Sequence, residues 1–162
     1  MQTALQRKPA TSIDDLRESI PKLGELTGKP NEAKSLLERL EATLLVKPPS
    51  SGPRVLVLLG IEGDDQALWY VKKNSLHGLA LHAAGARNAV DEVINGAPSM
   101  SIERLLEVNP DIIIGMTAQP NPSVIQQDQF RQRFTKLTTL KAGQANHIAI
   151  ISGPEIYSAG PL

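Results

Sequence analysis

Hydrophobic positions in the first third of the chain recur at helical spacing. The first set falls at intervals of three and four residues: Ile13, Leu16, Ile20 and Leu23. This spacing is the period of one helix face. Ser12 followed by Asp15 is typical of a capping box at the start of such a helix. Pro21 lies inside the pattern and is expected to kink or divide the helix.

A second helix is predicted from about residue 31 to residue 46, after a turn over residues 24–30 that is rich in glycine and proline. Its apolar residues make one stripe: Ala33, Leu36, Leu37, Leu40 and Leu44. Residues 47–53 (KPPSSGP) cannot continue this helix. We therefore predict a helical lead-in over residues 1–53, with 47–53 as linker, and a separate domain over residues 54–162.

Beyond the linker, strand patterns alternate with helix patterns. Apolar, β-branched runs at Arg54 to Leu59 and at residues 111–115 are typical of strands buried on both faces. Shorter strands are expected at 88–90 and 147–151. Helices are expected at 75–84, 101–108, 123–134 and 139–144. This alternation predicts an α/β fold, a Rossmann-like parallel sheet with flanking helices, preceded by the long helical segment.

Composition narrows the functional classes. The 162 residues are 41% hydrophobic, enough for a core, and Lys plus Arg and Asp plus Glu each total 17. Without a basic stripe, no nucleic-acid partner is expected. Apolar runs are too short to span a bilayer, and residues 1–10 lack the apolar segment of a signal peptide, so no export signal is expected in this chain. Because cysteine is absent, disulfides and thiolate chemistry are excluded.

A ligand site is expected at the carboxyl ends of the parallel strands, where open α/β sheets bind ligands. The loops there are residues 60–74, 116–122 and 152–161. Three of the five aromatic residues fall in them, Trp69, Tyr70 and Tyr157, and Lys72 and Lys73 lie in the first loop. This arrangement predicts stacking on a flat or apolar ligand, with cations for negative charge. The alternative is that the rings pack the loop onto the sheet and the lysines are solvated.

Patterns of catalysis and metal binding are absent from the sequence. The loop at Gly60 follows a strand but has neither a dinucleotide nor a P-loop motif. His77 and His82 are five residues apart and do not share a helix face, so no zinc site is predicted. The adjacent carboxylates Asp64 and Asp65 are expected to be solvated. We predict neither a metal site nor catalytic residues, and hence no enzyme.

The order of the segments resembles the C-terminal half of one family. The stretches that carry the resemblance are SIDDLRESIPKLGELTGKPNEAKSLLERLEATL, RVLVLLG, NSLHGLALHAAGARNAV, SMSIERLLEVNPDIIIG and LKAGQANHIAIISG. They are similar to the metal-chelate class of periplasmic binding proteins, which serve ABC importers of ferric siderophores, haem and cobalamin. Each motif is modest, but their order and spacing together are fairly specific.

The resemblance implies that residues 1–53 end an N-terminal lobe and include the helix that joins two lobes. Residues 54–162 would form the C-terminal lobe, without the terminal helix that the family has after its glycine-proline turn, here Gly160 and Pro161. The ligand would lie between the lobes and touch Trp69, Tyr70, Lys72, Lys73 and Tyr157. No cofactor is implied apart from this ligand, an iron chelate, haem or cobalamin.

The family also implies partners and a location. Glu103 stands in the Ser-x-Glu position, where family members present an acidic residue to the importer's permease subunits. The parent protein would be periplasmic or lipid-anchored outside the cytoplasm. The missing lobe leaves open a homodimer through the surface that it would cover. Two alternatives remain: a Rossmann-like nucleotide-binding enzyme that uses the Gly60 loop, and a non-transport interaction module.

Overall fold

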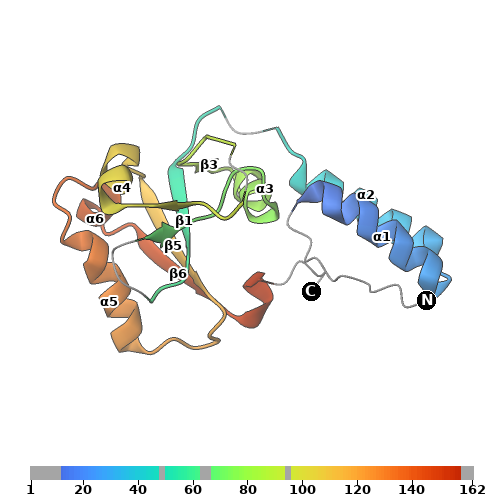
Figure 1. The fold of residues 1–162 in the computed structure, drawn as a ribbon. Coiled ribbons are helices and arrows are strands. Elements are labelled where there is room, and N and C mark those ends of the chain that lie inside the picture. The colour runs from blue at the N-terminus through green and yellow to red at the C-terminus, as the bar shows by residue number, and fades with distance from the viewer. Residues whose placement is uncertain (1–11, 48–49, 63–66, 94–95, 158–162) are drawn as a thin grey trace.

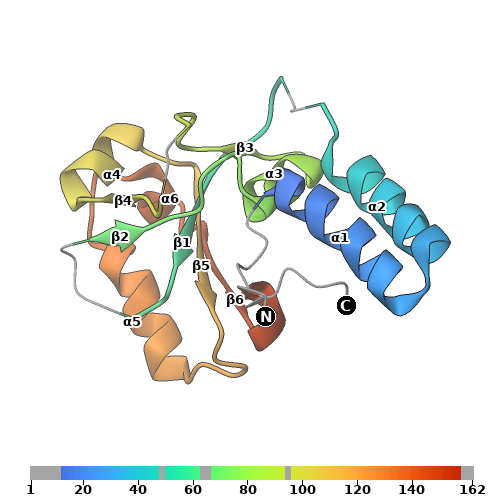
Figure 2. The same cartoon turned by 45° about the vertical axis from the view of Figure 1, so that its right-hand side comes forward.

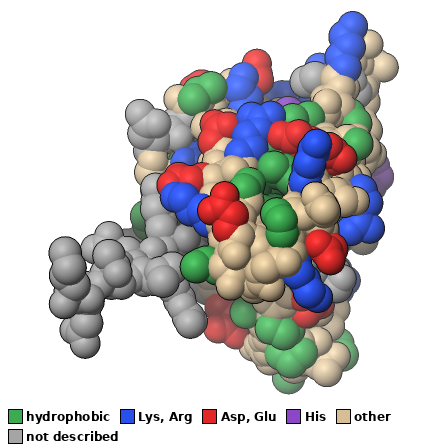
Figure 3. Space-filling model, turned by 90° about the vertical axis from the view of Figure 1, so that its right-hand side faces the viewer, with side chains coloured by type: hydrophobic (Ala, Val, Ile, Leu, Met, Phe, Trp, Pro, Cys, Tyr) green, Lys and Arg blue, Asp and Glu red, His purple; other side chains and the backbone are tan. Residues whose placement is uncertain are grey.

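The computed structural model describes residues 12–47, 50–62, 67–93 and 96–157. The chain forms a helical hairpin and an α/β part (Figure 1). The hairpin consists of α1 (Ile13–Thr27) and α2 (Pro30–Leu44), which lie side by side in both views (Figures 1 and 2). Its outer face carries acidic and basic side chains intermixed (Figure 3). The predicted helical lead-in is therefore confirmed as secondary structure.

Helix α1 begins as its sequence predicts. The backbone N–H of Asp15 donates to Ser12 Oγ at 3.2 Å, and the Ser12 N–H donates to the Asp15 carboxylate at 3.0 Å. The prediction that Pro21 divides the helix is wrong, because α1 runs unbroken through it. Pro21 is exposed, while Leu16 and Ile20 are buried. Burial of this face holds the helix together where one backbone hydrogen bond is missing.

The turn between the two helices is shorter than the predicted 24–30. Gly28 ends α1 in the left-handed conformation, with φ of 70°, which glycine adopts without strain. Gly24 remains helical and marks the contact between the helices, since a Cβ there would lie 2.5 Å from Ala33 Cβ. The glycine that suggested a turn therefore serves close helix packing. An ion pair of 2.6 Å between Arg17 and Glu41 also joins α1 to α2.

The predicted parallel sheet is confirmed. Its strands are β1 (Arg54–Leu59), β3 (Arg87–Asn88), β5 (Ile112–Thr117) and β6 (Ile148–Ser152), in the order β3-β1-β5-β6. A two-stranded antiparallel pair, β2 (Leu68–Trp69) with β4 (Ser99–Met100), was not predicted and lies beside the sheet (Figure 2). Strands of two residues leave too little periodicity to detect.

Four further helices flank the sheet: α3 (Leu76–Ala83), α4 (Ile102–Val108), α5 (Val124–Thr135) and α6 (Lys141–Gln144). A short 3-10 helix, η1, spans Pro154–Tyr157. Ser75, Ser101 and Ser123 cap α3, α4 and α5, each hydroxyl accepting a backbone N–H. These helix starts agree with the sequence because a capping hydroxyl is a local signal.

The core has two layers, one on each face of the sheet. Leu56 and Leu58 of β1 face α4, α5 and α6, and Val55 and Val57 face the side of α3. Phe130 and Phe134 of α5 are nearly fully buried, with ring centroids 5.2 Å apart in an edge-to-face arrangement. Gly115 of β5 admits Phe130, since a Cβ on Gly115 would lie 2.5 Å from its Cζ.

We predict that Gly115→Ala destabilises the fold. The added methyl would overlap Phe130 and Ile61 Cγ2, the latter at 2.8 Å, and overpacking of this kind costs about 1–3 kcal/mol. Urea unfolding would measure the change. Ala149→Val on the neighbouring strand is the control, because Ala149 is exposed and should change stability by less than about 0.5 kcal/mol. Equal unfolding midpoints for the two variants would contradict the packing account.

Candidate functional site

The three predicted ligand loops begin side by side at one edge of the sheet. Strands β1, β5 and β6 are parallel and in register, so their carboxyl ends coincide. The Gly60 N–H donates to Met116 O at 2.8 Å, and the Gly153 N–H donates to Thr117 O at 3.0 Å. Both glycines have positive φ, 104° and 139°, which turns the chain sharply out of the sheet. We call this the carboxyl edge.

The two aromatic residues of the first loop have opposite environments. Trp69 is 47% exposed, but Tyr70 is only 5% exposed and belongs to the core. Tyr70 bridges Leu58 of β1 in antiparallel pairing, and this pairing directs its ring into the protein. Burial raises the pKa of the Tyr70 hydroxyl. Tyr70 therefore packs the loop onto the sheet, as the alternative held, and is not available to a ligand at the surface.

Lys72 and Lys73 also lie away from the carboxyl edge. The chain from Trp69 onward runs antiparallel to β1, so Val71 pairs with Val57 and the two lysines follow further from the edge. Lys72 Nζ donates to Gly96 O at 3.1 Å, and Lys73 Nζ donates to Asp91 Oδ1 at 2.7 Å. The latter bond holds the pKa of Asp91 below its ordinary value. The prediction that this pair faces the ligand is not supported by these positions.

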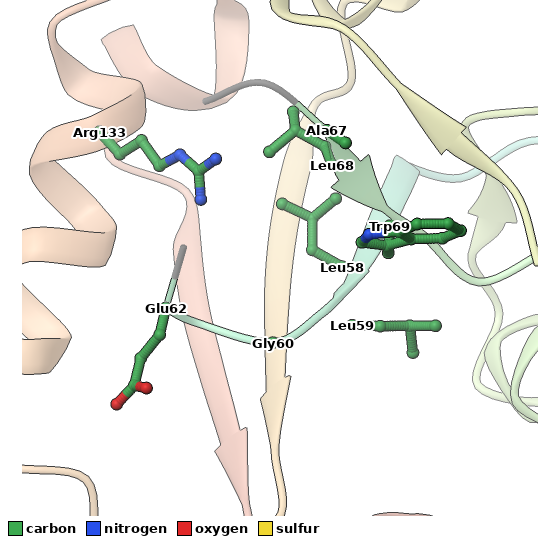
Figure 4. A pocket seen from close by; sticks show the side chains of 8 residues that line it. All are labelled: Leu58, Leu59, Gly60, Glu62, Ala67, Leu68, Trp69 and Arg133. Atoms are coloured by element: carbon green, nitrogen blue, oxygen red, sulfur yellow. The ribbon is translucent and has the colours of Figure 1, made fainter. Parts of the chain in front are cut away.

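A pocket of about 290 Å³ lies beside the start of the first loop (Figure 4). It is lined by Leu58, Leu59, Gly60, Glu62, Ala67, Leu68, Trp69 and Arg133. Arg133 and Glu62 come from one side of Leu58, and Trp69 and Leu59 from the other (Figure 4). The Glu62 carboxylate points away from the Arg133 guanidinium (Figure 4). Arg133, from α5, was missed by the sequence analysis because its position depends on how α5 packs.

A polar network fixes the first loop to the second. Gln126, in the first turn of α5, donates from Nε2 to the Glu62 carboxylate and to Gln119 Oε1, the latter at 3.2 Å. Its Oε1 accepts the Ser123 backbone N–H at 2.8 Å. Gln126 also completes the capping box with Ser123, but its bond to Glu62, 64 positions away, has no sequence signal.

The third loop is anchored to α3. His77 Nε2 lies 2.6 Å from the carbonyl oxygen of Ile156, which ties η1 to this helix. Tyr157 is the last residue of η1, next to this anchor. The aromatic-rich edge predicted from sequence therefore includes Trp69 and the segment that carries Tyr157, but it excludes Tyr70.

Glu103 lies exposed in the first turn of α4. The Ser101 hydroxyl and the helix backbone lower the pKa of its carboxyl group below the ordinary 4.5. The next residue, Arg104, pairs with Glu92 and Glu107, both at 2.9 Å. Local hydrogen bonding accounts for the position of Glu103 without a partner protein.

The described ranges hold no group of three or more His, Asp or Glu side chains placed to bind a metal ion. Asp64 and Asp65 lie outside these ranges. Within the same part of the chain, no helix is long and apolar enough to cross a membrane.

Comparison with known families agrees with this architecture. A family model described as "Periplasmic binding protein" matches residues 1–154. The chain belongs to the periplasmic binding protein family, as its motifs predicted. Membership implies an extracytoplasmic location, and the family consists of substrate-binding proteins. A comparison with curated proteins gives no match.

Several solved structures share the fold. An ABC transporter substrate-binding protein from Listeria monocytogenes EGD-e is 24% identical, with a TM-score of 0.63 over 86% of this chain and 55% of its own. An ABC-type Fe3+-hydroxamate transport system from Saccharomonospora viridis DSM 43017 is 22% identical, with a TM-score of 0.64 over 94% of this chain and 51% of its own. A periplasmic heme binding protein from Pseudomonas aeruginosa is 21% identical, with a TM-score of 0.65 over 93% of this chain and 56% of its own. The chain thus spans about half the length of each.

We predict that Ser101→Ala raises the carboxyl pKa of Glu103 toward its ordinary value. A lowered carboxyl pKa means that folding favours the charged form, so this contribution to stability is present at neutral pH and is lost as the pH falls through the folded-state pKa. Side-chain NMR titration of Glu103 would measure the shift. Ser75→Ala, which removes the cap of α3, is the control and should leave the Glu103 pKa unchanged. If the Glu103 pKa were the same in Ser101→Ala as in the unaltered protein, the assigned cause would be refuted.

Proposed function

We propose that this chain is part of the substrate-binding component of an ABC importer, and that its ligand is an iron chelate such as a ferric siderophore or haem. The family match over residues 1–154 carries this proposal. It is supported by the similarity to a ferric-hydroxamate transport system and to a haem-binding protein. Cobalamin, the third ligand of the class, has no such support among these structures.

The carboxyl edge is the proposed ligand-binding face of this chain. It brings together the exposed ring of Trp69, the exposed Leu59 and Ile151 side chains, and the segment leading to Tyr157. Apolar and aromatic surface with a few polar groups is typical of small-molecule sites. Because the chain spans about half of each related structure, the remaining ligand contacts would come from a second lobe.

The α1–α2 hairpin supports a rigid link between lobes. Its two helices are joined by the Arg17–Glu41 ion pair and by the Gly24–Ala33 contact, and both resist sliding of one helix along the other. We infer that α2 acts as a stiff strut, so closure around a ligand would be small. Binding without catalysis is part of the same proposal.

Glu103 is the proposed contact with the permease of the importer. It is exposed at the start of α4, and its neighbour Arg104 is paired with other carboxylates. A single exposed charge pair is worth ~0.2–1 kcal/mol. Glu103 would therefore orient docking more than it would add affinity.

The proposed ligand site can be tested by fluorescence, because Trp69 is the only tryptophan of the chain. We expect a ferric hydroxamate or haem to quench its emission saturably, since both absorb light and would lie near the ring. By calorimetry, Trp69→Phe should weaken binding roughly threefold to tenfold through lost aromatic contact.

The controls for this experiment separate the alternatives. Leu26→Ala, at an exposed apolar position of the hairpin, should bind normally. A saturable response to a nucleotide, lost on changing Gly60, would favour the enzyme alternative. Absence of saturable binding by every iron chelate would refute the proposed function.

Docking to the permease is a separate prediction. Glu103→Ala should weaken binding to a reconstituted permease of this importer class by up to about fivefold, and high salt should reduce the difference. Surface plasmon resonance would measure both values. Glu38→Ala on α2 is the matched control, since Glu38 is also exposed. If the two variants bound the permease equally well, the assignment of Glu103 would fail.

A further inference from the structure

The last strand of the sheet, β6, has one edge that pairs with no other strand of the described residues. In the order β3-β1-β5-β6 it is a border strand, and it pairs only with β5. The Ile113 N–H donates to His147 O at 3.0 Å, and the Gly153 N–H donates to Thr117 O at 3.0 Å. Because backbone groups alternate in direction along a parallel strand, this register turns the groups of three residues away from the sheet: Ile148, Ile150 and Ser152.

This edge of β6 lacks the features that usually protect a border strand. Native proteins protect such edges with charged residues, proline, bulges or very short strands. The opposite border, β3, is only two residues long and carries Arg87. In contrast, β6 has five residues, Ile-Ala-Ile-Ile-Ser, without proline. Its register with β5 is continuous over five pairs, so it contains no bulge. The edge is therefore open to pairing with a further strand.

The two faces of β6 have different environments. Ile148 and Ile150 belong to the side that packs on the core under α5 and α6. Ala149 and Ile151 lie on the opposite face, because side chains alternate along a strand. Both are exposed, Ile151 to 48%. A strand added to this edge would cover part of a large apolar side chain and a small one, two positions apart.

The edge is complementary to itself. In an antiparallel pair, a residue whose backbone groups face the other strand exchanges two hydrogen bonds with the residue opposite. If Ile150 lies opposite Ile150 of a second copy, Ile148 falls opposite Ser152, and the outward groups of all three positions are paired in both copies. On the exposed face, the same register sets Ile151 opposite Ala149, a large side chain against a small one, and this contact occurs twice.

The charge distribution also fits a second copy. Two identical edges always bring like charges together, and like charges on opposite strands are destabilising. Residues 142–154 contain no Asp, Glu, Lys or Arg, and the formal net charge of the chain is zero. Neither the strand nor the whole chain therefore repels its own copy by charge.

From this geometry we infer that two copies of the chain associate through β6, as an antiparallel strand pair centred on Ile150 that joins their two sheets into one. A single pair of five-residue strands is small against the roughly 1,200–2,000 Å² of a standard interface, so the dimer is weak and depends on concentration. Antiparallel pairing directs the carboxyl edges of the two copies in opposite directions. The inference goes beyond the proposed function and does not depend on it.

Sedimentation equilibrium of the 162-residue chain, from micromolar to millimolar concentration, measures this association. We expect a monomer–dimer equilibrium. Ile151→Lys should raise its dissociation constant at least about fivefold, because it removes a contact that occurs twice and adds a charge to the edge. Leu26→Lys is the matched control: Leu26 is 75% exposed on the hairpin, so the same charge is added away from β6 and the dissociation constant should not change.

Two results of this experiment would overturn the inference. One is a chain that stays monomeric at every concentration. The other is a dimer that Leu26→Lys weakens as much as Ile151→Lys does, since this would place the interface on the hairpin side, where a second lobe would lie.

Disulfide cross-linking tests the register independently. The chain has no cysteine, so Ala149→Cys and Ile151→Cys each introduce a single thiol. In the proposed register these two positions are opposite each other, about 4.5–5.5 Å apart and within reach of a disulfide. The same position in the two copies is a diagonal pair, roughly 7–8 Å apart, at or beyond that reach. Oxidising a mixture of the two variants should give several-fold more linked dimer than oxidising either alone. Equal yields would refute the proposed pairing.

Discussion

The in-register pairing of β1, β5 and β6 is the constraint on which the rest of the structure depends. Parallel pairing brings the ends of the three strands to one level, so loops far apart in sequence start next to each other. Helix α5 packs closely on β5 at this sheet, and Gly115 provides the space for Phe130. The site is thus a consequence of sheet geometry, and loop residues only determine what the edge can bind.

Local signals in the sequence were sufficient for most of the fold. Serine caps and the buried strand runs each depend on a few neighbouring residues, and these elements occur where they were predicted. Pro21 and Gly24 were misjudged because their roles depend on tertiary contacts of the hairpin. Helix α1 runs through the exposed Pro21, and its packing against α2 needs a glycine at position 24.

The candidate site was less predictable for a related reason. Loop membership placed Trp69, Tyr70 and the lysines near the edge, but side-chain direction follows from the antiparallel pairing of residues 69–71 with β1. This pairing buries Tyr70 and carries Lys72 away from the edge. The Glu62–Gln126 bond is likewise a long-range contact. Because of these contacts, the two lysines lie away from the carboxyl edge where the sequence placed them.

The most direct test is to map ligand contacts residue by residue. Titration of isotope-labelled protein with an uncharged gallium(III) trihydroxamate, a diamagnetic substitute for the ferric complex, would show by NMR which backbone amides shift. The account predicts that the largest shifts fall at Leu59, Trp69 and Gly153, around the carboxyl edge. Shifts concentrated at the opposite edge of the sheet, near Arg54 and Asp111, would contradict it.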